Sequence, residues 1–225
     1  MKLYHLYKSV LAGFVFFTAS SLSAAMTEEV VELQDEWARI KYLLPEKEQE
    51  SAFQLLSEKA AKVSDAHQDN AEALVWEGII LSTYAGVKGG LGALGLAKQA
   101  RTVFEHAIEI DPSVMHGSAY TSLGSLYYQV PSWPVGFGDD DKAMEYLTKG
   151  LELNPDGIDS NYFYGDYLLK RGDYVKAEEA FNKALLAPAR EGREIADKGR
   201  HDEIEEAMAK LKSQQTVAGK KNSLF

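Results

Sequence analysis

The stretch "SNYFYGDYLLKRGDYVKAEEAFNKALLAP", residues 160–188, decides the fold. Gly165 lies in a first helix-like segment, and Ala177 lies in a second with Phe181 one turn further on and Pro188 after it. Twelve residues separate Gly165 from Ala177, which leaves room only for a short turn. Small residues let two helices approach closely, and a large residue fills the gap that remains between neighbouring pairs. The stretch therefore predicts an antiparallel pair of helices.

Two earlier parts of the chain repeat this arrangement. The segment "SAYTSLGSLYY" (118–128) is followed by "DKAMEYLTKGLELNP" (141–155), and "AEALVWEGIIL" (71–81) is followed by "AKQARTVFEHAIEIDP" (97–112). Each copy has a glycine in its first helix, an alanine in its second and a proline after that. These residues are Gly78, Gly124 and Gly165; Ala100, Ala143 and Ala177; Pro112, Pro155 and Pro188. Because proline cannot continue a helix, each second helix is expected to end there.

This combination is the tetratricopeptide pattern, and it predicts an all-α helical solenoid of about three repeats. The repeats span about 70–112, 116–155 and 159–188. Helical spacing of apolar residues adds N-terminal helices and a polar-faced terminal helix that caps the stack. The expected parts are helices over 27–44, 46–66 and 194–215, a single domain over 26–215, and a flexible tail over 216–225.

The first two repeats are longer than the third between their two helices. The glycine-to-alanine separation is 19 residues in the second repeat and 22 in the first, against 12 in the third. The extra residues predict long loops over "QVPSWPVGFGDDDKA" (129–143) and "GVKGGLGALG" (86–95). Insertions at matching places in stacked repeats emerge on one edge of the solenoid, where two loops can form a shared feature.

The first 25 residues have the layout of a secretory signal peptide. "MKLYHLYKSVLAGFVFFTASSLSAA" (1–25) places Lys2 and Lys8 before an apolar run over 10–17, and small residues follow. We expect cleavage after Ala24 or Ala25 and a periplasmic location; an uncleaved membrane anchor is the alternative. The apolar run is shorter than the ~20 residues that a membrane-spanning helix needs.

Composition narrows the function classes. The chain carries a net charge of −10, which argues against nucleic acid or an anionic membrane surface as partner, since both need a basic face. It has no cysteine, so disulfides, thiol catalysis and cysteine metal sites are excluded. None of the histidines of the expected mature chain pairs with another at helical spacing, so we expect no zinc site. No serine lies in a nucleophile-elbow context. We therefore expect a non-enzymatic protein without a metal or other cofactor.

Two sequence motifs suggest ligands but have simpler interpretations. Gly90, Gly92 and Gly95 match the dinucleotide fingerprint, yet no strand precedes them, which favours a flexible apolar loop whose Leu91 contacts a partner. The run Asp139–Asp141 invites a calcium interpretation, but three consecutive acids do not point one way. Capping of the next helix is the favoured role, and a weak Ca²⁺ contact stays open.

Aromatic residues are the sharpest candidates for recognition. Trp133 and Phe137 lie among prolines and glycines and have no helical partner by spacing, so they either fold back as a plug or face a partner. The first helices of repeats two and three are rich in tyrosine; most of these side chains should pack in the core. Some, with Tyr128, Tyr162 and Asn161 as candidates, could line a groove on the concave face, to which Asp159 and Asp166 could add negative charge.

Three phrases carry a family resemblance. They are "LGSLYYQVPSWPVGFGDDDKA", "LNPDGIDSNYFYGDYLLKRGDYVKAEEAF" and "LAPAREGREIADKGR". With them the chain resembles, over roughly residues 70–200, the periplasmic tetratricopeptide proteins grouped with the T component of tripartite ATP-independent periplasmic (TRAP) transporters. The resemblance implies an exported binding or assembly protein linked to uptake of small organic acids. Expected partners are a periplasmic protein, a small organic ligand or a second copy of the chain.

Overall fold

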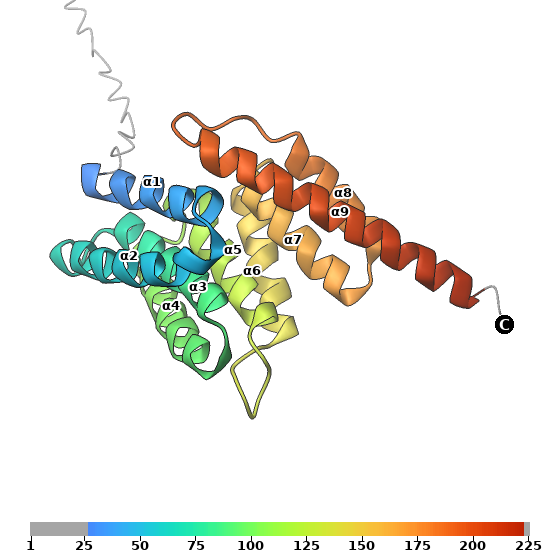
Figure 1. Ribbon diagram of the computed structural model, residues 1–225, viewed down its shortest axis with the longest axis horizontal. Helices are drawn as coiled ribbons and strands as arrows, with labels where there is room; N and C mark the ends of the chain where they lie inside the picture. Colours follow the sequence, from blue (N-terminus) through green and yellow to red (C-terminus); the bar gives the residue numbers. More distant parts are fainter. Residues whose placement is uncertain (1–26, 223–225) are drawn as a thin grey trace, which may run out of the picture.

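A computed structural model describes residues 27–222, with side chains as far as residue 216. Within this part the chain is helical and has no β-strand, which confirms the all-α solenoid (Figure 1). The helices are α1 (Glu28–Leu43), α2 (Glu46–Ala66), α3 (Ala71–Lys88), α4 (Gly90–Ile110), α5 (Val114–Gln129), α6 (Asp140–Leu153), α7 (Ile158–Arg171), α8 (Tyr174–Leu185) and α9 (Glu194–Asn222). The signal peptide expected over residues 1–25 lies outside the described residues.

Three helix pairs form the predicted repeats, and each pair closes on a glycine. A Cβ atom added to Gly165 of α7 would lie 2.8 Å from the ring of Phe181 in α8. The same addition to Gly124 of α5 would lie 2.8 Å from Leu147 in α6, and at Gly78 of α3 it would collide with Phe104 of α4. These large side chains are at most 1% exposed. The glycines therefore make room for the residues that fill each pair, as the spacing predicts.

The ends of the helices follow from local chemistry. α4 stops at Ile110 and α6 at Leu153, two residues before Pro112 and Pro155 respectively. In the third repeat Gly172 closes α7 in the left-handed conformation, with φ of 80°, which lets the chain turn at once into α8. The short turn expected between these helices is thus confirmed.

The long loop expected over residues 86–95 is not present. α3 continues to Lys88 and α4 begins at Gly90, so that only Gly89, with φ of 63°, joins them. The extra residues lengthen both helices because alanine and leucine, which favour helix, surround the glycines. The boundary expected at residue 215 is also wrong, since α9 continues to Asn222.

The remaining helices cover the repeats at one end and across one face. α1 and α2 pack on α3 around Trp37, Phe53 and Trp76, and the Nε1 of Trp37 donates a hydrogen bond of 2.9 Å to Thr83. α9 packs on α8, and it also contacts α1 and α7 before it runs beyond the other helices (Figure 1). None of the helices described is long and apolar enough to cross a membrane.

Candidate functional site

The α5–α6 loop is a narrow hairpin closed by backbone hydrogen bonds. The amide of Gly138 donates to the carbonyl of Pro131 at 3.0 Å. The amide of Asp139 donates to the carbonyl of Tyr127 at 2.9 Å. A Cβ atom at Gly136 would collide with the carbonyl of Pro131. Glycine is therefore needed where the two arms of the loop approach each other. These contacts hold the loop away from the helices in one shape (Figure 1).

The two aromatic side chains of this loop have different environments. Phe137 folds back onto the stack, where its ring meets that of Tyr127 edge-on at 5.6 Å and lies 4.6 Å below the guanidinium of Arg101. Trp133 points away and is 86% exposed, with Val135 beside it 60% exposed. The sequence left open whether these aromatic side chains fold back onto the stack or face outward. Phe137 folds back and anchors the loop, whereas Trp133 faces solvent.

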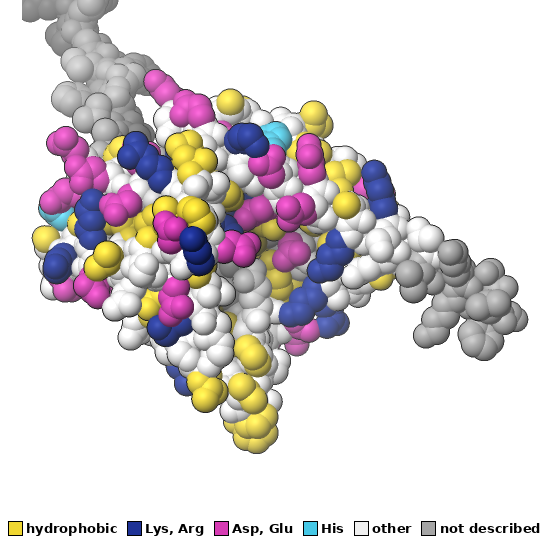
Figure 2. Space-filling view, viewed as in Figure 1, with side chains coloured by type: hydrophobic (Ala, Val, Ile, Leu, Met, Phe, Trp, Pro, Cys, Tyr) yellow, Lys and Arg dark blue, Asp and Glu magenta, His cyan; other side chains and the backbone are white. Residues whose placement is uncertain are grey.

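The loop and the α3–α4 joint leave the stack at the same edge. This follows because α3 and α5 hold equivalent positions in consecutive repeats. Leu91, in the first turn of α4, is 92% exposed. Figure 2 shows apolar side chains gathered at the lower tip of the molecule, over the α5–α6 loop. We call Leu91, Trp133 and Val135 the apolar tip; a solvated surface rarely concentrates such side chains without a partner.

The aspartate run after the loop serves the following helix. The carboxylate of Asp139 accepts hydrogen bonds of 3.0 Å from the amides of Asp141 and Lys142, so it caps α6. Asp140 pairs with Arg171 of α7. The described residues contain no group of three or more side chains that could hold a metal ion. The capping interpretation is therefore confirmed.

The candidate groove residues are mostly engaged within the protein. Tyr128 is 2% exposed and its hydroxyl donates to Asp166 at 2.7 Å. Tyr162 lies under the guanidinium of Arg200, 4.3 Å from ring centre to Cζ. Asn161 is 3% exposed, and its amide donates to the carbonyls of Pro155 and Gly157 at 2.9 and 2.8 Å. The donors of Asn161 are thus used by the turn before α7, and its part in ligand binding stays a prediction.

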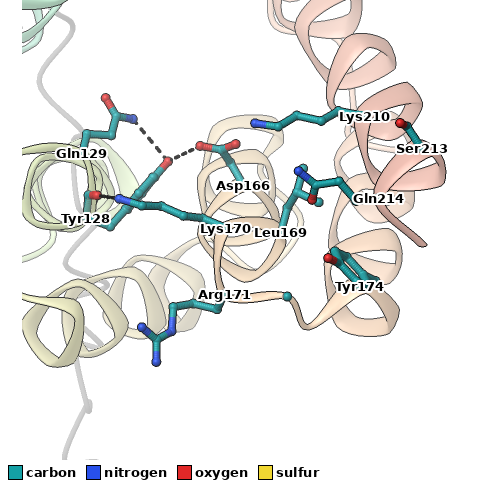
Figure 3. A pocket seen from close by; sticks show the side chains of 11 residues that line it. Tyr128, Gln129, Asp166, Leu169, Lys170, Arg171, Tyr174, Lys210, Ser213 and Gln214 are labelled. Atoms are coloured by element: carbon teal, nitrogen blue, oxygen red, sulfur yellow. Dashed lines mark hydrogen bonds between the residues drawn. The ribbon is translucent and has the colours of Figure 1, made fainter. Parts of the chain in front are cut away.

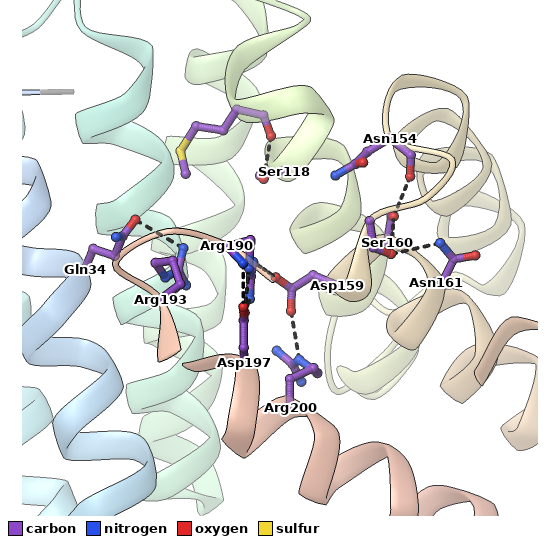
Figure 4. A network of polar contacts seen from close by, with 12 residues as sticks. Gln34, Ser118, Asn154, Asp159, Ser160, Asn161, Arg190, Arg193, Asp197 and Arg200 are labelled. Carbon is purple, nitrogen blue, oxygen red and sulfur yellow. Dashed lines mark hydrogen bonds and ion pairs between the residues drawn. The ribbon is translucent and has the colours of Figure 1, made fainter. Parts of the chain in front are cut away.

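A partly buried ionic network joins α7 to α9 (Figure 4). Asp159 accepts from Arg190 at 2.7 Å and from Arg200 at 2.8 Å, and Arg190 also donates to Asp197 at 2.7 Å. Arg200 is only 8% exposed and pairs in addition with Glu203. Asp159 therefore adds no free negative charge to a groove, contrary to the expectation from sequence. No sequence pattern singled out Arg190, Arg193 and Arg200, although all three lie in the phrase "LAPAREGREIADKGR".

The same segment covers the face formed by the first helices of the repeats. Arg193 stacks over Trp76 of α3, and Arg200 stacks over Tyr162 and Phe163 of α7. A Cβ atom at Gly199 would collide with the ring of Tyr42 in α1. The chain thus fills much of its own concave face with residues 190–203.

An open cleft remains further along α9 (Figure 3). It has a volume of about 850 Å³ and lies between the ends of α5 and α7 and the second half of α9. Lys210 of α9 extends across it toward Asp166, while Lys170 donates to the backbone carbonyl of Tyr128. Burial raises the pKa of Tyr128 well above its usual range, and the charge of Asp166 adds to this. The tyrosine hydroxyl therefore stays protonated and acts as a donor.

A family model adds to this geometry. The tetratricopeptide-repeat model matches residues 136–156 and 158–189, which contain α6 and the α7–α8 pair. The chain carries tetratricopeptide repeats. A thermophilic tetratricopeptide-repeat protein of Thermus thermophilus shares the fold, with a TM-score of 0.51 and 20% identity over 82% of this chain and 91% of that one. The crystal structure of MamA is less similar, with a TM-score of 0.43 and 21% identity over 77% of this chain and 95% of that one.

One curated relative matches part of the chain. The general transcriptional corepressor CYC8 of Saccharomyces cerevisiae is 36% identical over 70 residues, or 31% of this chain. The chain matches 7% of the length of that relative. The likeness to the Thermus thermophilus protein extends to the helical fold alone.

Proposed function

We propose that this protein is an exported, non-catalytic interaction scaffold that captures a partner protein with its apolar tip. The observation that carries the proposal is the 86% exposure of Trp133 at the end of a hairpin whose base is fixed by hydrogen bonds. A preformed loop loses little conformational freedom on binding, and buried tryptophans contribute strongly to interfaces.

The concave face of the solenoid is largely covered by the chain itself, which favours the apolar tip as the binding surface. Solenoids commonly bind partners along that face, but here residues 190–203 occupy much of it through the contacts of Arg193 and Arg200. A projecting tip fits a concave apolar pocket on the partner. The net charge of −10 favours a protein over nucleic acid as that partner.

Replacing Trp133 by alanine is expected to weaken partner binding by about 2 kcal/mol, or roughly 30-fold in Kd. Folding stability should change little because the side chain is exposed. The partner is first identified by crosslinking and mass spectrometry in the cell envelope, and its affinity is then measured by calorimetry. Leu186→Ala is the matched control, since Leu186 is 84% exposed away from the tip. Equal affinities of the Trp133 variant and the wild type would reject the proposal.

A more specific role is accessory T component of a TRAP transporter, which assists uptake of small organic acids. The phrases that favour it include "LGSLYYQVPSWPVGFGDDDKA", which contains the displayed tryptophan. In this role the partner is a solute-binding protein or a second copy of the chain. Co-purification of a solute-binding protein with the wild type, but not with the Trp133 variant, supports the role. The role is contradicted if the wild type captures a partner that the Trp133 variant loses and no transport component is among the captured proteins.

Export has its own expected result. N-terminal sequencing of the protein from the cell envelope should start near Ala25 or Met26, because Lys2, Lys8 and the apolar run that follows have the layout of a cleaved signal. A product that retains Met1 and fractionates with the cytoplasm would contradict this prediction.

A further inference from the structure

The charges around the α8–α9 segment do not balance. Within residues 27–216 the cluster holds four cations and three carboxylates; these are Lys41, Arg190, Arg193 and Arg200, and Asp159, Asp197 and Glu203. Arg190 and Arg200 share Asp159, and Lys41 pairs with Glu203 at 3.3 Å. Among the described residues each of these carboxylates is thus paired with another cation, and Arg193 has no ion pair of its own.

The guanidinium of Arg193 instead contacts uncharged side chains. Its Nη1 donates to the side-chain oxygen of Gln34 at 3.1 Å, an uncharged acceptor, and its guanidinium lies 5.2 Å from the ring centre of Trp76. Among the described residues the Nε of Arg193 is buried and has no hydrogen-bond partner, and neither has the Nε1 of Trp76, whose side chain is 1% exposed. Burial, followed by repulsion from Arg190, lowers the pKa of Arg193 to about 10.

A bound anion would both accept hydrogen bonds from the two neighbouring donors and supply a negative charge beside Arg193. Buried donors without acceptors are costly, and so is a partly buried charge without a counter-charge. A single guanidinium and one indole N–H offer few donors, which favours a small anion of low charge.

We propose that a small monovalent anion, chloride or a simple carboxylate such as acetate, binds beside Arg193 and Trp76. Such an anion accepts from the guanidinium and the indole and neutralises the excess charge. It thereby ties the start of α9 to α3 and, through Gln34, to α1. The anion then holds the segment that covers the concave face.

The test measures thermal unfolding of the full mature chain at constant ionic strength. Sodium isethionate, whose anion is bulky, is replaced stepwise by sodium chloride or sodium acetate. The Tm should rise by about 5 °C or more when the small anion reaches a hundredfold excess over its Kd. Arg193→Met should abolish this rise, whereas Arg171→Met should retain it because Arg171 is an exposed residue paired with Asp140. Trp76→Phe, which keeps an aromatic ring but loses the N–H donor, should reduce it.

The variants distinguish specific anion binding from a general effect of salt. General salt effects raise the Tm of the wild type and of Arg193→Met alike, and that result overturns the proposal, as does a wild type that does not respond. If Arg193→Met does not fold, chloride-35 line broadening is measured on the wild type and on Trp76→Phe. Broadening that the wild type shows and Trp76→Phe largely loses supports the site; equal broadening in both, or none in the wild type, rejects it.

Discussion

Truncation of Phe181 to alanine is expected to lower the free energy of unfolding by about 3–5 kcal/mol. Phe181 is fully buried in α8 and occupies the space that Gly165 leaves in α7, and the tight packing around it limits collapse of the resulting cavity. Urea unfolding followed by circular dichroism measures the change. Val175→Ala on the same helix is the control, because Val175 is 66% exposed and should change stability by less than about 0.5 kcal/mol.

The contact itself is tested by a second substitution. Gly165→Ala should be destabilising in the wild type, since the added Cβ would lie 2.8 Å from the ring of Phe181. In the Phe181→Ala background the same change should cost less, because the ring is gone. Strictly additive effects would show that these two residues do not pack together, and the alignment of the third repeat would then be wrong.

Replacing Asp159 by alanine is expected to cost about 3 kcal/mol of stability at neutral pH. The cost arises mainly at Arg200, which is 8% exposed and would keep only Glu203 as a counter-charge. Arg190 would keep Asp197. Chemical unfolding at pH 7 measures the loss, and Asp202→Ala offers a control at an exposed pair with Lys198.

The effect of Asp159 should depend on pH in a defined direction. Burial alone would raise the pKa of Asp159, but Arg200 and Arg190 outweigh it and hold the pKa well below its usual range. A carboxyl group with a depressed folded-state pKa stabilises the fold above its unfolded value of about 3.9, and this stabilisation is lost as the pH falls through the folded pKa. The difference between wild type and Asp159→Ala should therefore be full near pH 7 and shrink below about pH 4. A difference that grows toward acid pH would contradict the ionic network.

The repeats could be predicted because their signals are local. Gly165, Ala177 and Phe181 lie within one helix pair, and their spacing reports directly on which side chains meet. The same counting failed at residues 86–95, since extra residues between two helices can lengthen the helices instead of forming a loop. Glycine is a weak helix breaker when alanine and leucine surround it, so Gly92 and Gly95 lie inside α4.

The site was less accessible to sequence reasoning because its contacts cross between elements. Trp133 and Phe137 have similar surroundings in the sequence, and they differ because Tyr127, and Arg101 of the preceding repeat, contact the ring of Phe137. Asp159 meets Arg190 and Arg200 from 31 and 41 positions away, distances with no periodic signal. Asn161 looked like a groove residue, but the carbonyls of the turn before α7 take its donors.

The central claim is that Trp133 touches the partner. Site-specific photo-crosslinking tests it most directly: a benzophenone amino acid replaces Trp133 in one variant and Leu186 in another, and both are irradiated in intact cells. Both positions are more than 80% exposed, so they sample solvent equally well. We expect one discrete crosslinked protein from position 133 and none from position 186. Crosslinks to the same protein from both positions, or from position 186 alone, would contradict the claim that the apolar tip is the binding element.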